Sequence, residues 1–261
     1  MNRSEIFLVM VSGMGTIAGS VMGTYIGMLG GTDPAAKVLF ATHLLSASVM
    51  AVPGSIVLAK MLCPQTEEAT DHVAISGKEK ENSNILDAIS SGTVTGVKLM
   101  TNIAAMLLVF ISLVALANYI TEGVIGRYTG LNDWIVKITD GKAQGLTFQF
   151  ILGVITSPFM WLIGVPSQDI MLVGSLLGQK TILNEFVAYF QLQQWKDAGL
   201  FMYEKSILMS TYILCGFANI SSIGILLGGL GVLAPEKRGL ISRIGLPAMI
   251  GGAWSLCYRL L

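Results

Sequence analysis

The chain has 261 residues, of which 53% are hydrophobic and only 12% are charged, and its mean hydropathy is +0.69. Soluble globular domains carry about 25% charged residues, so this composition excludes an ordinary soluble domain and indicates a membrane protein. The 16 basic and 16 acidic residues balance, and the chain therefore has no basic excess that would attract a nucleic acid.

Several apolar stretches are long enough to cross a bilayer, which takes about 20 residues for a hydrocarbon core of roughly 30 Å. Ile6–Leu29, Leu39–Cys63 and Met100–Ile120 meet this requirement clearly. Ile207–Leu233 is long enough but contains polar residues, and Ile244–Leu261 is marginal. The sequence thus predicts an all-α membrane protein, a helical bundle embedded in the lipid bilayer.

Two segments between these stretches are predicted to lie in water. Pro64–Ser83 has seven charged residues among twenty, a density that prevents burial. Thr121–Gly145 is polar and rich in glycine, and it is predicted to be a second aqueous loop. Between them, Asn84–Leu99 mixes apolar residues with Ser, Thr and Gly, which indicates an amphipathic helix at the membrane surface.

The region Leu146–Leu192 contains shorter apolar segments. Its interruptions fall at Ser157-Pro158, Gly164–Ser167 and Asn184-Glu185. Two spanning helices here would place Asp169, Lys180 and Glu185 in lipid. We therefore predict a re-entrant hairpin, since non-helical backbone at membrane depth is tolerated only inside protein or along a cavity.

Two of the long helices contain residues that predict an interruption. Gly13–Thr16 consists of weak helix formers, and Asn219–Ser222 places an amide and two hydroxyls in an apolar stretch. Such groups either join helices or line a binding site, because they must be hydrogen-bonded. Interrupted helices with hairpins are typical of secondary transporters.

Glycine recurs at every fourth position in the first apolar stretch. The residues are Gly15, Gly19, Gly23 and Gly27. This spacing predicts close packing of the helix against a neighbour.

Glu185 is the strongest single candidate for a functional residue. A carboxylate at membrane depth costs about 2.5–3.5 kcal/mol on insertion scales, so it usually faces a cavity and has a function. The alternative is a hairpin tip that water reaches. The sequence contains no HExxH, GxSxG, GxxxxGK[ST] or dinucleotide-binding fingerprint, so an enzyme is not expected.

Three strings together resemble the concentrative nucleoside transporters. They are Leu183–Tyr189 (LNEFVAY), Cys215–Gly224 (CGFANISSIG) and Gly228–Pro235 (GGLGVLAP). Further strings agree in the same order along the chain, namely Gly15–Val21 (GTIAGSV), Ala47–Pro53 (ASVMAVP), Asn84–Ala88 (NILDA) and Ile163–Pro166 (IGVP). The resemblance covers essentially the whole chain.

The resemblance implies a nucleoside symporter that is a multi-pass homotrimer in the inner (plasma) membrane and is coupled to Na+ or H+. Each protomer would move one nucleoside by an elevator-like motion of a transport domain against a scaffold. The second hairpin would be Asp169–Leu192, and the unwound helices would lie at Thr16-Ile17 and Asn219–Ser222. Met100–Ile120 resembles the scaffold helix.

The domain division that follows has five segments. They are 1–63 (first interrupted helix and the next helix), 64–99 (polar loop and interfacial helix), 100–120 (scaffold-type helix), 121–145 (polar loop) and 146–261 (hairpin, second interrupted helix and final helix).

The resemblance also implies a set of site residues. Glu185, Asn219 and Ser222 would hold the ribose, because carboxylate and amide groups can engage vicinal hydroxyls. Three further residues would line the apolar side of the nucleoside: Phe217, Val21 and Leu99. The Thr16 hydroxyl and the Ile17 carbonyl would form part of a sodium shell.

The GQTEAP string of the family's first hairpin does not occur in this sequence. The resemblance implies that this hairpin recognises the base and completes the sodium shell, so the choice between purine and pyrimidine stays open. The choice between Na+ and H+ also stays open, because most ligands of the ion would be backbone atoms. The chain is accordingly expected to be a C-terminal portion of a transporter. The alternative is a truncated membrane subunit or remnant that does not transport.

Overall fold

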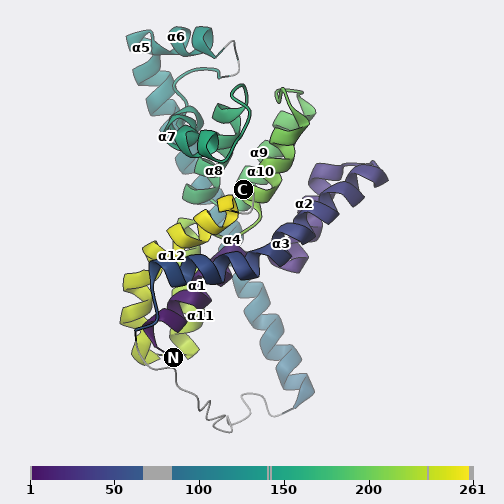
Figure 1. Cartoon of the computed structure of the whole chain (residues 1–261), viewed down its shortest axis with the longest axis vertical. Helices are drawn as coiled ribbons and strands as arrows, with labels where there is room; N and C mark the ends of the chain where they lie inside the picture. Colours follow the sequence, from purple (N-terminus) through teal and green to yellow (C-terminus); the bar gives the residue numbers. More distant parts are fainter. Residues whose placement is uncertain (1, 67–83, 140, 142, 234, 259–261) are drawn as a thin grey trace. The chain divides into compact units, whose positions relative to one another are not determined.

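The computed structural model describes residues 2–66, 84–139, 141, 143–233 and 235–258. Its elements are all helical, without a strand in the described ranges (Figure 1). The predicted all-α class is therefore confirmed. Contacts divide the chain into two compact units: Met1–Glu68, Asp140–Ala143 and Gln149–Leu261 form the first, and Ala69–Thr139 and Gln144–Phe148 form the second.

The first unit begins with α1 (Arg3–Gly15), α2 (Gly19–Gly30) and α3 (Pro34–Leu62). The side chain of Asn2 accepts from the Glu5 amide, and the Glu5 carboxylate accepts from the Asn2 amide, so a capping box starts α1. The carboxylate of Asp33 caps α3 by accepting a hydrogen bond from the Ala35 amide. Thr16, Ile17 and Ala18 separate α1 from α2 without helical structure.

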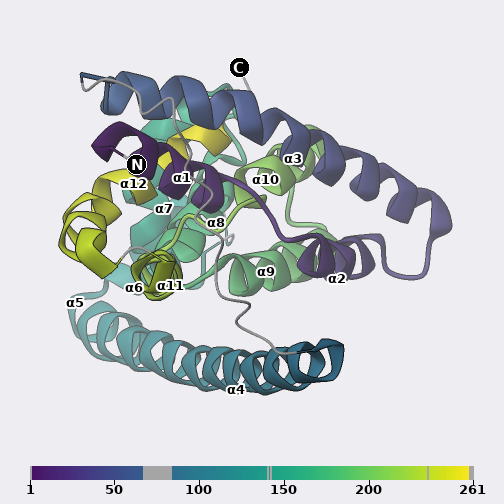
Figure 2. The same cartoon turned by 90° about the horizontal axis from the view of Figure 1, so that it is seen from below.

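The remainder of this unit is a series of helices. They are α7 (Phe148–Leu162), α8 (Ile170–Ile182), α9 (Glu185–Asp197), α10 (Glu204–Leu214), α11 (Ile220–Leu233), the 3-10 turn η2 (Pro235–Lys237) and α12 (Arg238–Tyr258). In Figure 2, α9 runs beside α2, and the two helices are in contact. The turn between α7 and α8 contains Gly164 at φ 80°, a conformation that favours glycine.

The predicted interruption at Ser157-Pro158 is wrong, because α7 continues through Pro158. The hydroxyl of Thr156 donates to the Leu152 carbonyl at 2.8 Å, and that of Ser157 donates to the Gly153 carbonyl at 2.6 Å. Polar groups next to the proline therefore stay hydrogen-bonded inside the helix, as they commonly do in membrane helices.

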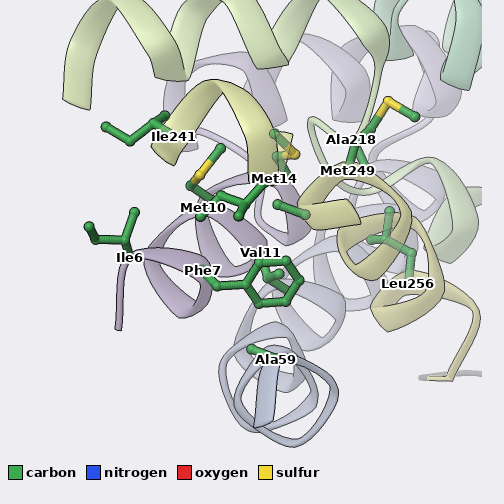
Figure 3. Packing of buried hydrophobic residues seen from close by; sticks show 12 residues of the cluster. Ile6, Phe7, Met10, Val11, Met14, Ala59, Ala218, Ile241, Met249 and Leu256 are labelled. Atoms are coloured by element: carbon green, nitrogen blue, oxygen red, sulfur yellow. The ribbon is translucent and has the colours of Figure 1, made fainter. Parts of the chain in front are cut away.

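The main hydrophobic cluster of the first unit joins α1, α12 and α3. Figure 3 shows Phe7, Met10 and Met14 in this cluster with Met249 and Leu256. The helices approach closely because α12 presents glycine here: a Cβ on Gly252 would lie 2.9 Å from that of Met14. Small residues at helix contacts are the usual packing device in membranes.

Three of the four glycines in the repeat of the first apolar stretch do not pack closely against other described residues. A Cβ added at Gly19, Gly23 or Gly27 would meet no described atom within 4 Å. Gly15 is the exception, because Gly216 approaches its backbone closely. Among the described residues, the packing role expected for the repeat is therefore wrong for Gly19, Gly23 and Gly27.

The second unit contains α4 (Ile85–Asn118), the π-helix η1 (Tyr119–Gly126), α5 (Arg127–Thr129) and α6 (Leu131–Ile138). Segments 84–99 and 100–120 were expected to be separate, but α4 passes from one into the other because no helix breaker lies between them. The expected loop Thr121–Gly145 is largely helical. Asn132 holds it together by donating to the Glu122 carbonyl and accepting from the Leu146 amide.

Two helices among the described residues have the length and apolar composition needed to cross a membrane, namely α3 and α12. The predicted aqueous segment Pro64–Ser83 lies outside the described residues from position 67 onward.

Candidate functional site

The candidate site is built at two breaks in the helices of the first unit. One break separates α1 from α2, and the other, Cys215–Asn219, separates α10 from α11. They touch each other: a Cβ on Gly216 would lie 3.1 Å from both the carbonyl carbon and the oxygen of Gly15. A larger residue at position 216 would be crowded against this backbone, so the glycine allows the second break to lie close to the end of α1, where the first break begins.

Asn219 is the last residue of the second break, directly before α11. Its side-chain oxygen accepts the Ser222 amide at 2.8 Å and the Ser221 hydroxyl at 2.7 Å, which caps the start of α11. The Ser222 hydroxyl lies 2.8 Å from the same oxygen and also contacts the Phe217 carbonyl. These two acceptors share the single hydroxyl hydrogen of Ser222, so its hydroxyl has no spare donor, but its oxygen can still accept a hydrogen bond from another partner.

Glu185 reaches Asn219 from a different part of the chain. It is the first residue of α9, after a two-residue turn in which Asn184 caps the helix through the Val187 amide at 2.9 Å. The Glu185 carboxylate accepts a hydrogen bond of 2.9 Å from the Asn219 amide group and is only 5% exposed. The structure thus brings together Glu185, Asn219 and Ser222, the three residues to which the resemblance assigns the ribose.

An apolar wall adjoins these polar groups. Ile17 and Val21 pack, half-buried, against a cluster that includes Tyr189 and Cys215. Within it, Tyr25 stacks on Tyr189 with ring centroids 4.0 Å apart. The two aromatic rings hold α2 against the start of α9.

Two of the predicted apolar residues are not brought into this cluster. Phe217 is half-buried in the break itself, and its described contact is through its carbonyl. Leu99 belongs to α4 of the second unit, and its side chain lies outside what the structure describes.

Oxygen atoms suited to a hard cation lie at the first break. The Thr16 hydroxyl donates to the Ser12 carbonyl at 3.1 Å and keeps its lone pairs for a cation. The Ile17 carbonyl accepts no hydrogen bond from any residue that the structure describes. The C-terminal end of α1 carries partial negative charge, so these groups are chemically suited to a monovalent cation.

Surface cavities do not define this site. Two of them open at the ends of α1 and α3, and both are lined by Arg3, Leu62 and Cys63. Neither contains a residue of the two breaks.

The sequence did not single out Lys180 as a site residue, although it is fully buried beside the site. Its ammonium group donates to the Ile213 carbonyl at 3.0 Å. Asp169 is also fully buried, and its carboxylate accepts the amides of Met202 and Tyr203 before α10. Both residues stand out in the sequence as charges within an apolar stretch. Their backbone partners could not be predicted, because any residue supplies a backbone carbonyl or amide.

Comparison with known proteins gives a consistent result. The family model described as Na+ dependent nucleoside transporter C-terminus matches residues 43–259. An uncharacterized transporter of Haemophilus influenzae is 39% identical over 255 residues, covering 97% of this chain and 56% of that protein. Sodium/nucleoside cotransporter 1 of Rattus norvegicus is 38% identical over 268 residues, covering 97% and 38%.

The nucleoside permease NupC of Helicobacter pylori is 36% identical over 257 residues, covering 98% of this chain and 56% of the permease. Among solved structures, CNTnw in an inward-facing substrate-bound state aligns with a TM-score of 0.79 and 34% identity, over 100% of this chain and 57% of that one. The chain therefore spans little more than half the length of these bacterial relatives.

Proposed function

Because the chain belongs to the family of the C-terminal part of Na+ dependent nucleoside transporters, we propose that it forms the C-terminal domain of a membrane symporter that imports nucleosides together with a cation. The named relatives are transporters and not enzymes. The observation that carries the residue-level proposal is the bond between Glu185 and Asn219 at the junction of two helix breaks.

In this proposal Glu185, Asn219 and Ser222 hold the ribose. The carboxylate accepts hydrogen bonds from vicinal hydroxyls, and the Asn219 amide and Ser222 hydroxyl supply further polar contacts. In the present arrangement the Asn219 amide satisfies one oxygen of Glu185. A ribose would exchange or share that contact, and the site would discriminate against sugars that leave its buried polar groups unpaired.

The apolar wall complements the ribose contacts. Val21 and Phe217 are proposed to line the apolar side of the nucleoside, and for Leu99 this role stays what the resemblance implies. Burial of Val21 against the aromatic cluster supports its place at this wall.

Sodium is the proposed coupling ion, with a proton as the alternative. Thr16 and the Ile17 carbonyl would contribute part of its shell. Their neutral oxygens at the C-terminal end of a helix are chemically suited to a monovalent cation. The similarity to sodium/nucleoside cotransporter 1 of Rattus norvegicus supports this choice.

The architecture proposed for the complete protein is a homotrimer in the inner membrane. Helices α8 and α9 would form a re-entrant hairpin with its tip at Leu183-Asn184, and each pair α1–α2 and α10–α11 would be one interrupted transmembrane helix. The short turn between α8 and α9 and the contact between the two breaks support this arrangement.

Uptake measurements test the function. Radiolabelled uridine and adenosine would be offered, with and without sodium, to vesicles containing this chain alone or the chain completed with the upstream part of a family member (the completed transporter). We expect sodium-dependent uptake by the completed transporter. Folded, membrane-inserted protein without uptake of either nucleoside would instead favour a non-transporting subunit or remnant.

A further inference from the structure

Lys180 is a fully buried cation that the proposed function does not use. It lies near the end of α8, two residues before the helix ends at Ile182. Lysine is almost never fully buried unless it is paired, and in a membrane protein such a charge is expensive unless it has a function.

The ammonium group of Lys180 acts at the C-terminal end of α10. The last four carbonyls of an α-helix lack partners within the helix, and here all four are satisfied. Thr211 accepts from the Tyr189 hydroxyl, Tyr212 from the Cys215 amide, Ile213 from Lys180, and Leu214 from the Gly216 amide. Two of these four donors, Lys180 and Tyr189, come from α8 and α9. Their hydrogen bonds attach these two helices, on either side of the turn between them, to the end of α10.

Lys180 and Glu185 therefore hold opposite ends of the same break. Lys180 binds the last turn of α10 through Ile213, and Glu185 binds Asn219, directly before α11. The positive charge of Lys180 is favourable at the C-terminal end of α10, and the negative charge of Glu185 is favourable at the N-terminal end of α11. The two side chains also interact electrostatically with each other.

We propose that Lys180 is a positioning residue for the ribose site: it fixes the turn of α8 and α9 against α10 and supplies the positive charge that keeps the buried Glu185 carboxylate aligned with Asn219. This inference rests on the proposed role of Glu185. Lys180 donates to the backbone carbonyl of Ile213 and, in this proposal, acts on the ribose through Glu185.

A double-mutant cycle in the completed transporter tests the inference. Its members are Lys180→Gln, which keeps a hydrogen-bond donor but removes the charge, Glu185→Gln, and the pair. Lys196→Gln is the matched control, because Lys196 donates to the Leu29 carbonyl at the end of α2, outside the site. The readouts are the apparent affinity for uridine and the melting temperature of the purified protein.

We expect Lys180→Gln to weaken uridine affinity tenfold or more and Lys196→Gln to change it less than twofold. The loss in the double variant should equal that of Glu185→Gln alone, because Lys180 acts through the same carboxylate. Lys180→Arg, which retains the charge, should keep more affinity than Lys180→Gln. Losses that multiply in the double variant, or an unchanged affinity in Lys180→Gln, would overturn the inference.

Two further outcomes are also decisive. If Lys180→Gln alone does not accumulate as folded protein, the double variant should recover folded protein, because the uncompensated charge of Glu185 is then removed as well. If neither variant gives folded protein, the proposed coupling of Lys180 to Glu185 is contradicted. If Glu185→Gln itself leaves uridine affinity unchanged, the proposed ribose site fails, and this result is distinct from a failure confined to Lys180.

Discussion

The side-chain amide of Asn219 donates a hydrogen bond of 2.9 Å to the carboxylate of Glu185, across 34 residues of sequence. Both groups are almost completely buried, with exposed fractions of 2% and 5%. The bond is charge-assisted and therefore stronger than a neutral one. It connects the start of α9 to the break before α11, and the following predictions depend on it.

Replacing Asn219 by Asp separates its two functions. Aspartate caps a helix as well as asparagine, so the bond to the Ser222 amide is retained. The donor to Glu185 is lost, and a second carboxylate now faces the first. We expect uridine affinity to fall tenfold or more and the melting temperature to fall as well, because two adjacent buried carboxylates repel each other.

The control for this variant is Asn84→Asp, because Asn84 caps α4 at the Asp87 amide at 2.9 Å, close to the 2.8 Å of the cap that Asn219 makes. It should leave uridine binding unchanged. Equal affinities in the parent and Asn219→Asp, measured by competition with radiolabelled uridine, would contradict a role for this pair in binding.

Gly216→Ala tests the contact between the two breaks. The new Cβ would lie 3.1 Å from the backbone of Gly15 and 3.0 Å from Leu256. Overpacking of this kind destabilises proteins by about 1–3 kcal/mol. The melting temperature should fall, and sodium-dependent uptake should fall with it, because Thr16 and Asn219 lie on the two sides of this contact.

Gly23→Ala is the matched control, since a Cβ at Gly23 meets nothing within 4 Å. This variant also replaces a glycine by alanine, but in the interior of α2, where alanine is the better helix former. Its melting temperature should therefore be unchanged or higher. A Gly216→Ala protein as stable and active as the parent would show that the close approach is not required.

Thr16→Val examines the cation groups at the first break. Valine has nearly the same shape but lacks the hydroxyl that we assign to the sodium shell. In the completed transporter we expect the sodium concentration for half-maximal uptake to rise, while the ratio of uridine to adenosine uptake stays the same. Thr42→Val removes an equivalent hydroxyl, bonded to Val38 on α3, and should have no effect. An unchanged sodium activation curve in Thr16→Val would rule out the assignment.

The sequence could predict the helices and the positions of the breaks because both are local properties. Apolar length marks α3 clearly and α12 only marginally, and Asn219 with two serines marks a place where an apolar helix needs polar partners. Pro158 was misread because the hydroxyls of Thr156 and Ser157 stabilise the helix around it. The segment after α4 was misread because polarity alone does not prevent helix formation.

The candidate site could be predicted only through the resemblance. Glu185 and Asn219 each stand out as polar residues in apolar surroundings, but nothing local shows that they meet. The role of Lys180 was not predictable, because its partner is the backbone carbonyl of Ile213 and any residue carries one. Among the described residues, the packing role expected for the glycine repeat was wrong for Gly19, Gly23 and Gly27, because spacing identifies a helix face and not its neighbour.

The most direct test of the account compares uptake of uridine, 2′-deoxyuridine and 3′-deoxyuridine by the completed transporter and its Glu185→Gln variant. Glutamine keeps the size but removes charge-assisted bonds, which contribute roughly 1.5–3 kcal/mol. Uridine affinity should therefore fall about ten- to a hundredfold, and the loss should be smaller for a nucleoside that already lacks a ribose hydroxyl. Equal losses for all three nucleosides, or no loss for any, would contradict the claim that Glu185 holds the ribose.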